Sequence, residues 1–251
     1  MSPILEVCCA SIASAIAAQE GGAHRIELCD NLYEGGTTPS YGTLELVRER
    51  LHIDINVLIR PRGSDFVYSK DEMKIIKRDI LMCKKLKVNG VVIGFLTPEG
   101  DIDVERTREI IELARPLSVT FHRAFDVCGD PFAALEELIG LGLDRILTSG
   151  QVNMAPEGVD LIAELVKKAG DRVIIMPGAG LEPENIGEFH SKVGAKEYHS
   201  TLWERVESEM IYRKPGVYMG GLPEIPEFSW TQTNSDKVKK FIDNIHGPRS
   251  F

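Results

Sequence analysis

The chain has 251 residues, of which 29 are Lys or Arg and 38 are Asp or Glu, so its formal net charge at pH 7 is −9. Hydrophobic residues make up 43% and charged residues 27%, a balance that excludes collagen, a long coiled coil and wholesale disorder. The acidic charge argues against binding to nucleic acid or to an anionic membrane. The sequence has no apolar run of about 18 residues, no basic leader and only five cysteines, which together predict a protein of the reducing cytoplasm.

Short β-rich runs alternate with segments of helical spacing along most of the chain. The runs cover residues 4–9, 25–30, 55–61, 90–96, 118–125, 145–150, 172–178 and 197–202. Helical spacing is clearest over residues 11–20, 71–86, 104–114, 131–141 and 158–169. A β-run followed by a helix, repeated eight times, is typical of a TIM barrel, a closed (β/α)₈ fold.

The alternative is an open, doubly wound sheet. That fold usually carries a Gly-x-Gly-x-x-Gly turn after its first strand, whereas the first run here ends in Cys8-Cys9. The sequence therefore predicts a single barrel domain over residues 1–251. Residues 203–235 are rich in Gly and Pro without a clear period, which predicts a long loop before a closing helix at 236–245.

Charged side chains gather near the ends of the predicted strands, which meet at one mouth of a barrel. We expect the arginines to balance the carboxylates there, as a structural ion network or as a binding site. Polar groups from at least six strands favour a site. The residues concerned are Glu6, Glu27, Arg60, Arg62, His122, Arg123, Asp126, Ser149 and His199.

The first two runs share a Glu-x-Cys pattern that ends in Cys8 and Cys29. Alternation along a strand puts Glu and Cys on one face, and we expect that face to point into the barrel. Two facing thiolates suit Cu(I), whereas each cysteine alone could simply be a small buried apolar residue. Arg60 or Arg62 nearby would lower the thiol pKa.

The other three cysteines are weaker candidates. Cys9 has the opposite parity and is expected to pack outward, Cys83 lies on an apolar helical stripe, and Cys128 is a weak third ligand near the mouth. The sequence has no Cys-x-x-Cys and no His-x-x-x-His, so a tetrahedral zinc site is not indicated, and we expect little affinity for Zn(II).

The second hypothesis is an enzyme that acts on a small phosphorylated or carboxylate substrate. Arg60, Arg62 and Arg123 would hold the anion, and Glu27, His122 or Asp126 would be the catalytic acid or base. Gly178 and Gly180, followed by a helix, resemble the phosphate-binding loop of many barrels, with His199 nearby. No reaction follows from these residues, and the sequence leaves a homo-oligomer open.

Six segments together resemble the signature of the CutC copper-homeostasis family. They are Glu6-Val7-Cys8, Arg25 to Cys29, Glu34 to Ser40, Ile59 to Gly63, Phe121 to Asp126 and Ile146 to Gly150. The resemblance covers about Leu5 to Leu202 and implies a cytoplasmic TIM barrel that binds Cu(I) through cysteines, with Cys8 and Cys29 at the two strand cysteines of the pattern. His24, Ser64 and Ala179 depart from it, the last two in the loops of the anion hypothesis.

Overall fold

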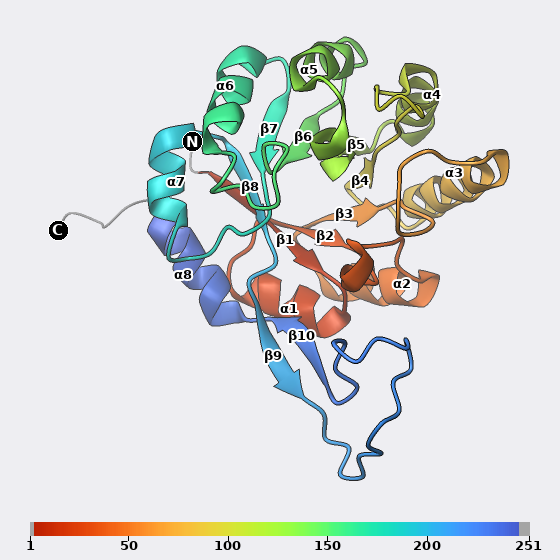
Figure 1. Ribbon diagram of the computed structural model, residues 1–251, viewed down its shortest axis with the longest axis vertical. Helices are drawn as coiled ribbons and strands as arrows, with labels where there is room; N and C mark the ends of the chain where they lie inside the picture. The colour runs from red at the N-terminus through yellow and green to blue at the C-terminus, as the bar shows by residue number, and fades with distance from the viewer. Residues whose placement is uncertain (1–2, 246–251) are drawn as a thin grey trace.

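The computed structural model describes residues 3–245 and shows eight parallel strands arranged as a barrel (Figure 1). Their hydrogen-bonded order is β7-β6-β5-β4-β3-β2-β1-β8, so β7 and β8 lie at the two ends of a sheet that is nearly closed. The predicted (β/α)₈ architecture is confirmed. The strands are β1 (Ile4–Cys9), β2 (Arg25–Leu28), β3 (Asp54–Leu58), β4 (Gly90–Ile93), β5 (Ser118–Phe121), β6 (Arg145–Thr148), β7 (Ile174–Pro177) and β8 (Glu197–Ser200).

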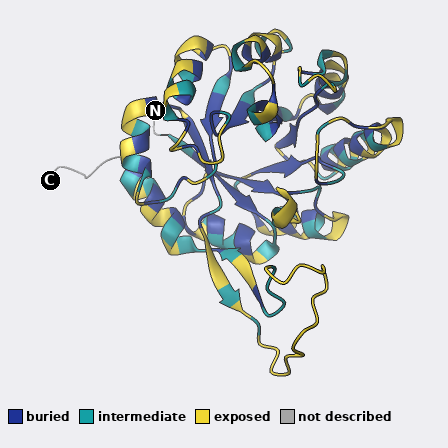
Figure 2. Ribbon diagram, viewed as in Figure 1, coloured by how far each residue is buried: buried dark blue, intermediate teal, exposed yellow. Residues whose placement is uncertain are grey.

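Residues 3–245 form eight α-helices. They surround the strands in Figure 1. They bury their inner faces against the sheet and leave their outer faces exposed (Figure 2). No helix among residues 3–245 is long and apolar enough to span a membrane. The helices are α1 (Ile12–Glu20), α2 (Tyr41–Arg50), α3 (Lys70–Lys85), α4 (Val104–Ala114), α5 (Pro131–Gly140), α6 (Val159–Ala169), α7 (Ile186–Val193) and α8 (Ser235–Ile245).

Local sequence explains where these helices begin and which face they bury. Ser69 and Glu72 form a reciprocal capping box at the start of α3, which satisfies backbone N–H groups that the helix itself leaves unpaired. Asp130 caps α5, and Pro131 takes the first helical position, where its missing N–H leaves no backbone hydrogen bond unmade. Cys83 is fully buried on the apolar stripe of α3, which agrees with its expected place in the core.

Several strands end earlier than the sequence predicts. The fifth run was expected to extend to residue 125, but β5 stops at Phe121 and a 3₁₀ helix, Arg123–Val127, follows. His122 causes the change, because its ring nitrogen Nδ1 accepts a hydrogen bond from the backbone N–H of Ala124 and caps the new helix. Arg123 and Asp126 therefore lie on a short helix at the mouth and not on a strand.

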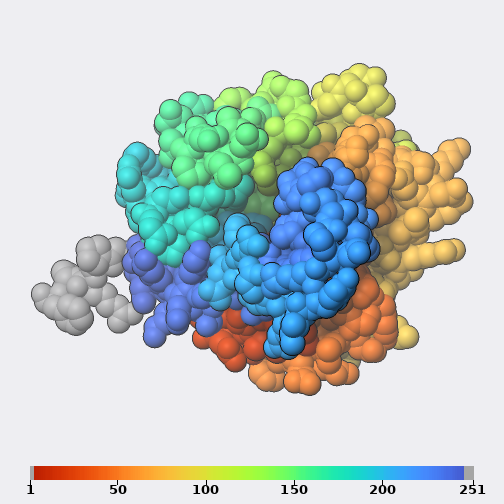
Figure 3. Space-filling view, turned by 60° about the horizontal axis from the view of Figure 1, so that its bottom comes forward, coloured from red at the N-terminus to blue at the C-terminus, as the bar shows by residue number. Residues whose placement is uncertain are grey.

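The segment 203–235 contains two strands that the loop prediction missed. β9 (Trp203–Glu207) and β10 (Ser229–Thr233) pair as an antiparallel hairpin, and both carry the aromatic and β-branched residues that strands favour. The hairpin is tied to the barrel where the backbone N–H of Thr233 donates to Ser14 Oγ at 3.2 Å. Figure 3 shows this segment, in blue, standing forward on the face turned to the viewer.

Three buried charged residues, Arg25, Glu6 and Glu197, form a cluster inside the barrel with the partly buried Arg145. The Arg25 guanidinium donates to Glu6 and to Glu197, the latter at 2.5 Å, and Arg145 Nε donates to the same Glu197 oxygen at 2.6 Å. Asn56 Nδ2 donates to Glu6 at 2.9 Å. The expectation that mouth arginines balance Glu6 is wrong, because these partners on strands β2 and β3 lie within reach inside the barrel.

Candidate metal centre and ligand cavity

Cys8 and Cys29 face each other inside the barrel. Strands β1 and β2 pair in a register that sets Cys8 opposite Glu27, and Cys29 follows directly after β2. The Cys8 Sγ and Cys29 Sγ atoms lie 3.5 Å apart, and both thiols are free and buried. The shared Glu-x-Cys pattern thus brings the two sulfurs into contact, as two ligands of one metal ion require.

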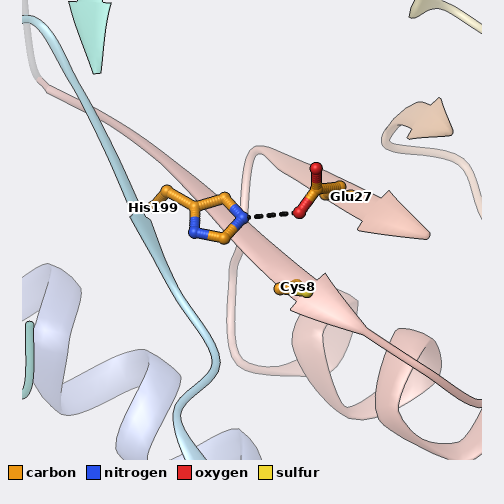
Figure 4. Close-up of side chains that lie close together, drawn as sticks. All are labelled: Cys8, Glu27 and His199. Carbon is orange, nitrogen blue, oxygen red and sulfur yellow. Dashed lines mark hydrogen bonds and ion pairs between the residues drawn. The ribbon is translucent and has the colours of Figure 1, made fainter. Parts of the chain in front are cut away.

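Glu27 and His199 complete a compact group of potential ligands around Cys8 (Figure 4). One donor atom from each of Cys8, Glu27 and His199 lies within 4.8 Å of the other two, and all three residues are buried. The His199 Nε2 atom lies 2.8 Å from Glu27 Oε2. Strands β1, β2 and β8 are neighbours in the sheet, so three strand positions far apart in sequence supply this group.

The electrostatic environment favours the protonated forms of Cys8 and His199. The hydrogen bond with Cys29, burial and the negative charge of Glu27 raise the pKa of the Cys8 thiol well above its ordinary value. The expectation that arginines lower this pKa is wrong, since Arg60 and Arg62 are bound elsewhere. Burial alone would lower the pKa of His199, but Glu27 and Cys8 outweigh it and raise that pKa well above its usual value.

The donor set fits a soft or borderline metal ion. With a metal–sulfur distance of about 2.3 Å, two sulfurs in linear coordination would lie about 4.6 Å apart. The observed 3.5 Å separation fits a bent arrangement that includes a third ligand, and His199 is placed to provide it. The sequence analysis expected low affinity for Zn(II) because too few ligands were in view. With His199 and Glu27 beside the two cysteines, four potential ligands are present, so that reason no longer holds.

Cys128 and Cys9 lie outside this group. Gln151 Nε2 donates to Cys128 Sγ at 3.5 Å and to the Cys128 carbonyl, which ties that residue to the loop after β6. Cys9 packs on the helix side of the sheet, where its sulfur lies 3.9 Å from Thr233 Oγ1. The sequence analysis assigned Glu27 to acid–base catalysis and His199 to the anion site. The alternation of side chains along β2 and β8 could have predicted that both residues face the barrel interior with the two cysteines.

The three arginines of the anion hypothesis have different surroundings. Arg60 is buried and its terminal nitrogens donate to the backbone carbonyls of Glu34, Gly36 and Ser64. Arg62 points away from the cavity, because Glu72 and Asp65 bind its guanidinium. Arg123 lines the cavity but is bound to Asp126 at 2.7 Å and donates to Ser149 Oγ. Arg60 and Arg123 line the cavity, whereas Arg62 does not.

The glycines after β7 shape the packing around His199. A Cβ atom at Gly178 would lie 2.7 Å from Leu147 and 3.1 Å from His199, and one at Gly180 would lie 2.7 Å from Met154. Gly180 and Glu182 line the cavity, and Glu182 brings a carboxylate to the loop in which the sequence predicts an anion. These surroundings favour a packing role for Gly178 and do not favour phosphate beside Glu182.

A cavity of about 420 Å³ opens at this end of the barrel, within the usual size range of small-molecule sites. Cys8, Glu27, Cys29 and His199 form part of its wall. The rest of the wall mixes apolar and polar side chains, among them Leu58, Arg60, Phe66, His122, Arg123, Asp126, Leu147 and Glu182.

Gly94 creates the space that His122 occupies beside this cavity. A Cβ atom there would lie 2.2 Å from His122 Cε1 and 2.9 Å from Ala124 Cβ. We expect Gly94→Ala to displace the buried ring and to lower the free energy of unfolding by about 1–2 kcal/mol, a typical cost of overpacking. Chemical denaturation measures the effect. Gly142→Ala is not a suitable control because of its positive φ, so Gly140→Ala, which meets no atom within 4 Å, serves instead.

Comparison with known proteins places this geometry in a family. The CutC family matches residues 3–203. A CutC family protein of Parabacteroides distasonis is 54% identical over 243 residues, covering 96% of this chain and 100% of that protein. One from Chromobacterium violaceum is 49% identical and covers 95% of this chain and 96% of its own.

Solved structures agree on the fold. The crystal structure of CutC from Streptococcus agalactiae matches with a TM-score of 0.76 and 36% identity, over 79% of this chain and 98% of that one. A phosphoribosylanthranilate isomerase of Thermotoga maritima matches with a TM-score of 0.58 at 16% identity, covering 98% of this chain and 100% of its own, which supports the barrel alone. By the family match and the identity of its relatives, the chain belongs to the CutC family.

Proposed function

We propose that the protein binds one Cu(I) ion as cargo in copper homeostasis, with Cys8, Cys29 and His199 as ligands. The observation that carries the proposal is the 3.5 Å contact of the two sulfurs beside the His199 imidazole. Thiolate and imidazole ligands suit Cu(I), and burial shields the ion from water and oxidants. The solved relative from Streptococcus agalactiae has a provisional assignment to copper homeostasis, which supports the same role.

Protons would compete with the metal at this site. Both cysteines must lose their protons to bind an ion, and the surroundings of Cys8 favour the protonated thiol. One Cu(I) would replace two thiol protons, so the buried site would gain one net negative charge beside Glu27. We accordingly expect proton release on binding.

The test is a Cu(I) titration of the reduced protein under anaerobic conditions, in competition with a chromophoric Cu(I) chelator. We expect about one Cu(I) per chain, and loss of most binding in Cys8→Ser and in Cys29→Ser. Cys83→Ser is the matched control, because Cys83 is equally buried but lies on α3, outside the ligand group. Circular dichroism verifies that each variant is folded.

Two results would contradict the proposal. One is a double variant, Cys8→Ser with Cys29→Ser, that still holds Cu(I) against the chelator. The other is a parent protein that binds Zn(II) at this site and no Cu(I) under the same competition. The second result would leave the ligand group as proposed but make Zn(II) its metal. His199→Ala would then be expected to weaken Zn(II) binding, because imidazole is a ligand of both ions.

An enzyme is the alternative function, and the cavity of about 420 Å³ favours it, since a site for a metal ion alone does not need that volume. In this alternative Glu27, His122 or Asp126 acts as acid or base on a small anionic substrate. The proposed location is the cytoplasm, where reduced thiols persist.

A further inference from the structure

His122 is a buried polar group in the cavity wall that the copper proposal leaves without a role. Its side chain occupies the space left by the missing side chain of Gly94 and packs against the Phe66 ring. The centroids of the two rings lie 4.9 Å apart. The residue is 5% exposed, and its Nε2 atom has no hydrogen-bond partner. A buried nitrogen without a partner costs free energy unless a bound molecule satisfies it.

The capping hydrogen bond fixes which nitrogen carries the proton. Nδ1 accepts from the Ala124 N–H at 3.1 Å, so Nδ1 is bare and the proton of the neutral ring is on Nε2. Burial and the nearby positive charge of Arg60 keep the ring neutral by lowering its pKa to about 3. His122 Nε2–H is therefore a fixed hydrogen-bond donor that faces no acceptor among residues 3–245.

The charges around His122 select the kind of acceptor. Arg60 is buried, its terminal nitrogens reach only backbone carbonyls, and no carboxylate within residues 3–245 forms an ion pair with it. Asp65 acts on Arg60 only at longer range, so among residues 3–245 no carboxylate contacts the positive charge at this end of the cavity. Four acidic residues, Glu27, Glu34, Asp126 and Glu182, also line the cavity, so a second negative charge on a ligand would be repelled.

We propose that the cavity binds a small organic monocarboxylate, one oxygen of which accepts the hydrogen bond from His122 Nε2. The Arg60 charge balances the carboxylate, and the apolar side chains of Leu58, Phe66 and Leu147 contact the carbon skeleton. Cys8, Glu27 and His199 line the same cavity, so the ligand lies beside the metal-binding group. The proposal stands whether or not that group holds Cu(I).

The experiment is isothermal titration of the reduced, metal-free protein with acetate, pyruvate and benzoate, with inorganic phosphate as the comparison. We expect at least one of the carboxylates to bind with millimolar or better affinity and phosphate to bind more weakly. His122→Asn keeps an oxygen to accept from the Ala124 N–H, but its shorter amide places no N–H donor at the position of the imidazole Nε2. We expect it to weaken carboxylate binding roughly tenfold or more.

His122→Gln provides the rescue, because its amide nitrogen reaches toward the position of Nε2. We expect His122→Gln to bind the carboxylate better than His122→Asn, and both variants to bind Cu(I) as the parent does. Two-bond ¹H–¹⁵N correlation spectra of the parent are expected to show the Nε2–H tautomer of His122.

Three outcomes overturn the proposal. They are the absence of binding by all three carboxylates at millimolar concentration, tighter binding of phosphate than of any carboxylate, and equal carboxylate affinity in the parent and in a folded His122→Asn variant. A His122 ring with its proton on Nδ1 removes the donor and also contradicts it. None of these results bears on Cu(I) binding at Cys8, so the two proposals fail separately.

Discussion

Replacing Arg25 by methionine is expected to lower the free energy of unfolding by about 3–5 kcal/mol, the usual cost of removing one partner from a buried ion cluster. Arg25 is 4% exposed and binds both Glu6 and Glu197. The substitution leaves Arg145 as the remaining cation on Glu197 and leaves Glu6 with the Asn56 amide. Chemical denaturation of the variant and the parent at pH 7 measures the difference.

Arg172→Met is the matched control for this experiment. Arg172 donates two hydrogen bonds to the single carboxylate of Glu136, and both side chains are about half exposed, at 47% and 50%. Exposed ion pairs contribute about 1 kcal/mol or less, so we expect a small effect. Equal losses in the two variants would contradict the idea that burial makes the Arg25 cluster costly to break.

Acid is expected to destabilise the protein through His122. Its pKa is about 3 when folded and has the ordinary value of 6.5 when the chain unfolds, because burial and the Arg60 charge outweigh the opposing effect of Asp126. Between these values the unfolded chain binds more protons, so the free energy of unfolding falls as the pH falls. The contribution amounts to about 3 kcal/mol between pH 7 and pH 4.

His122→Asn isolates this contribution, since asparagine keeps the cap on the Ala124 N–H and does not titrate. We expect the stability difference between the parent and the variant to shift by about 3 kcal/mol in favour of the variant on going from pH 7 to pH 4. Denaturant unfolding at several pH values measures it. Parallel pH curves for the two proteins would show that His122 does not control this part of the acid response.

Local patterns in the sequence predicted the fold and the contact between the cysteines well, because both depend on short-range periodicity. The alternation of β-runs and helices fixed the barrel, and the period of two on β1 and β2 put Cys8 and Cys29 on one face. Where polar chemistry changed the backbone, the prediction failed: the cap at His122 ends β5 and turns the next residues into a helix.

The partners of the charged side chains could not be predicted, because they depend on strand register. Glu6 was matched with mouth arginines, whereas the parallel pairing of β1 and β2 sets Arg25 opposite Glu6. Unknown register is also the reason why the ligand group could not be predicted. The pairing of β8 with β1 sets His199 opposite Glu6, and His199 Nε2 lies 2.8 Å from Glu27 Oε2. The direction of the Cys8 pKa shift was wrong for this reason too, since neighbouring carboxylates and thiols lie closer than any arginine.

The pairing of β8 with β1 has a consequence for how the chain folds. Their ladder pairs Ile4 with Glu197, so the two partners of one backbone pair are 193 residues apart in the sequence. Until β8 has been made, β1 presents an unpaired edge to the solvent, and closing so long a loop carries an entropic cost that slows folding. The ligand group, which needs Cys8 and His199 together, can assemble only at this last stage, so an incomplete chain cannot form it.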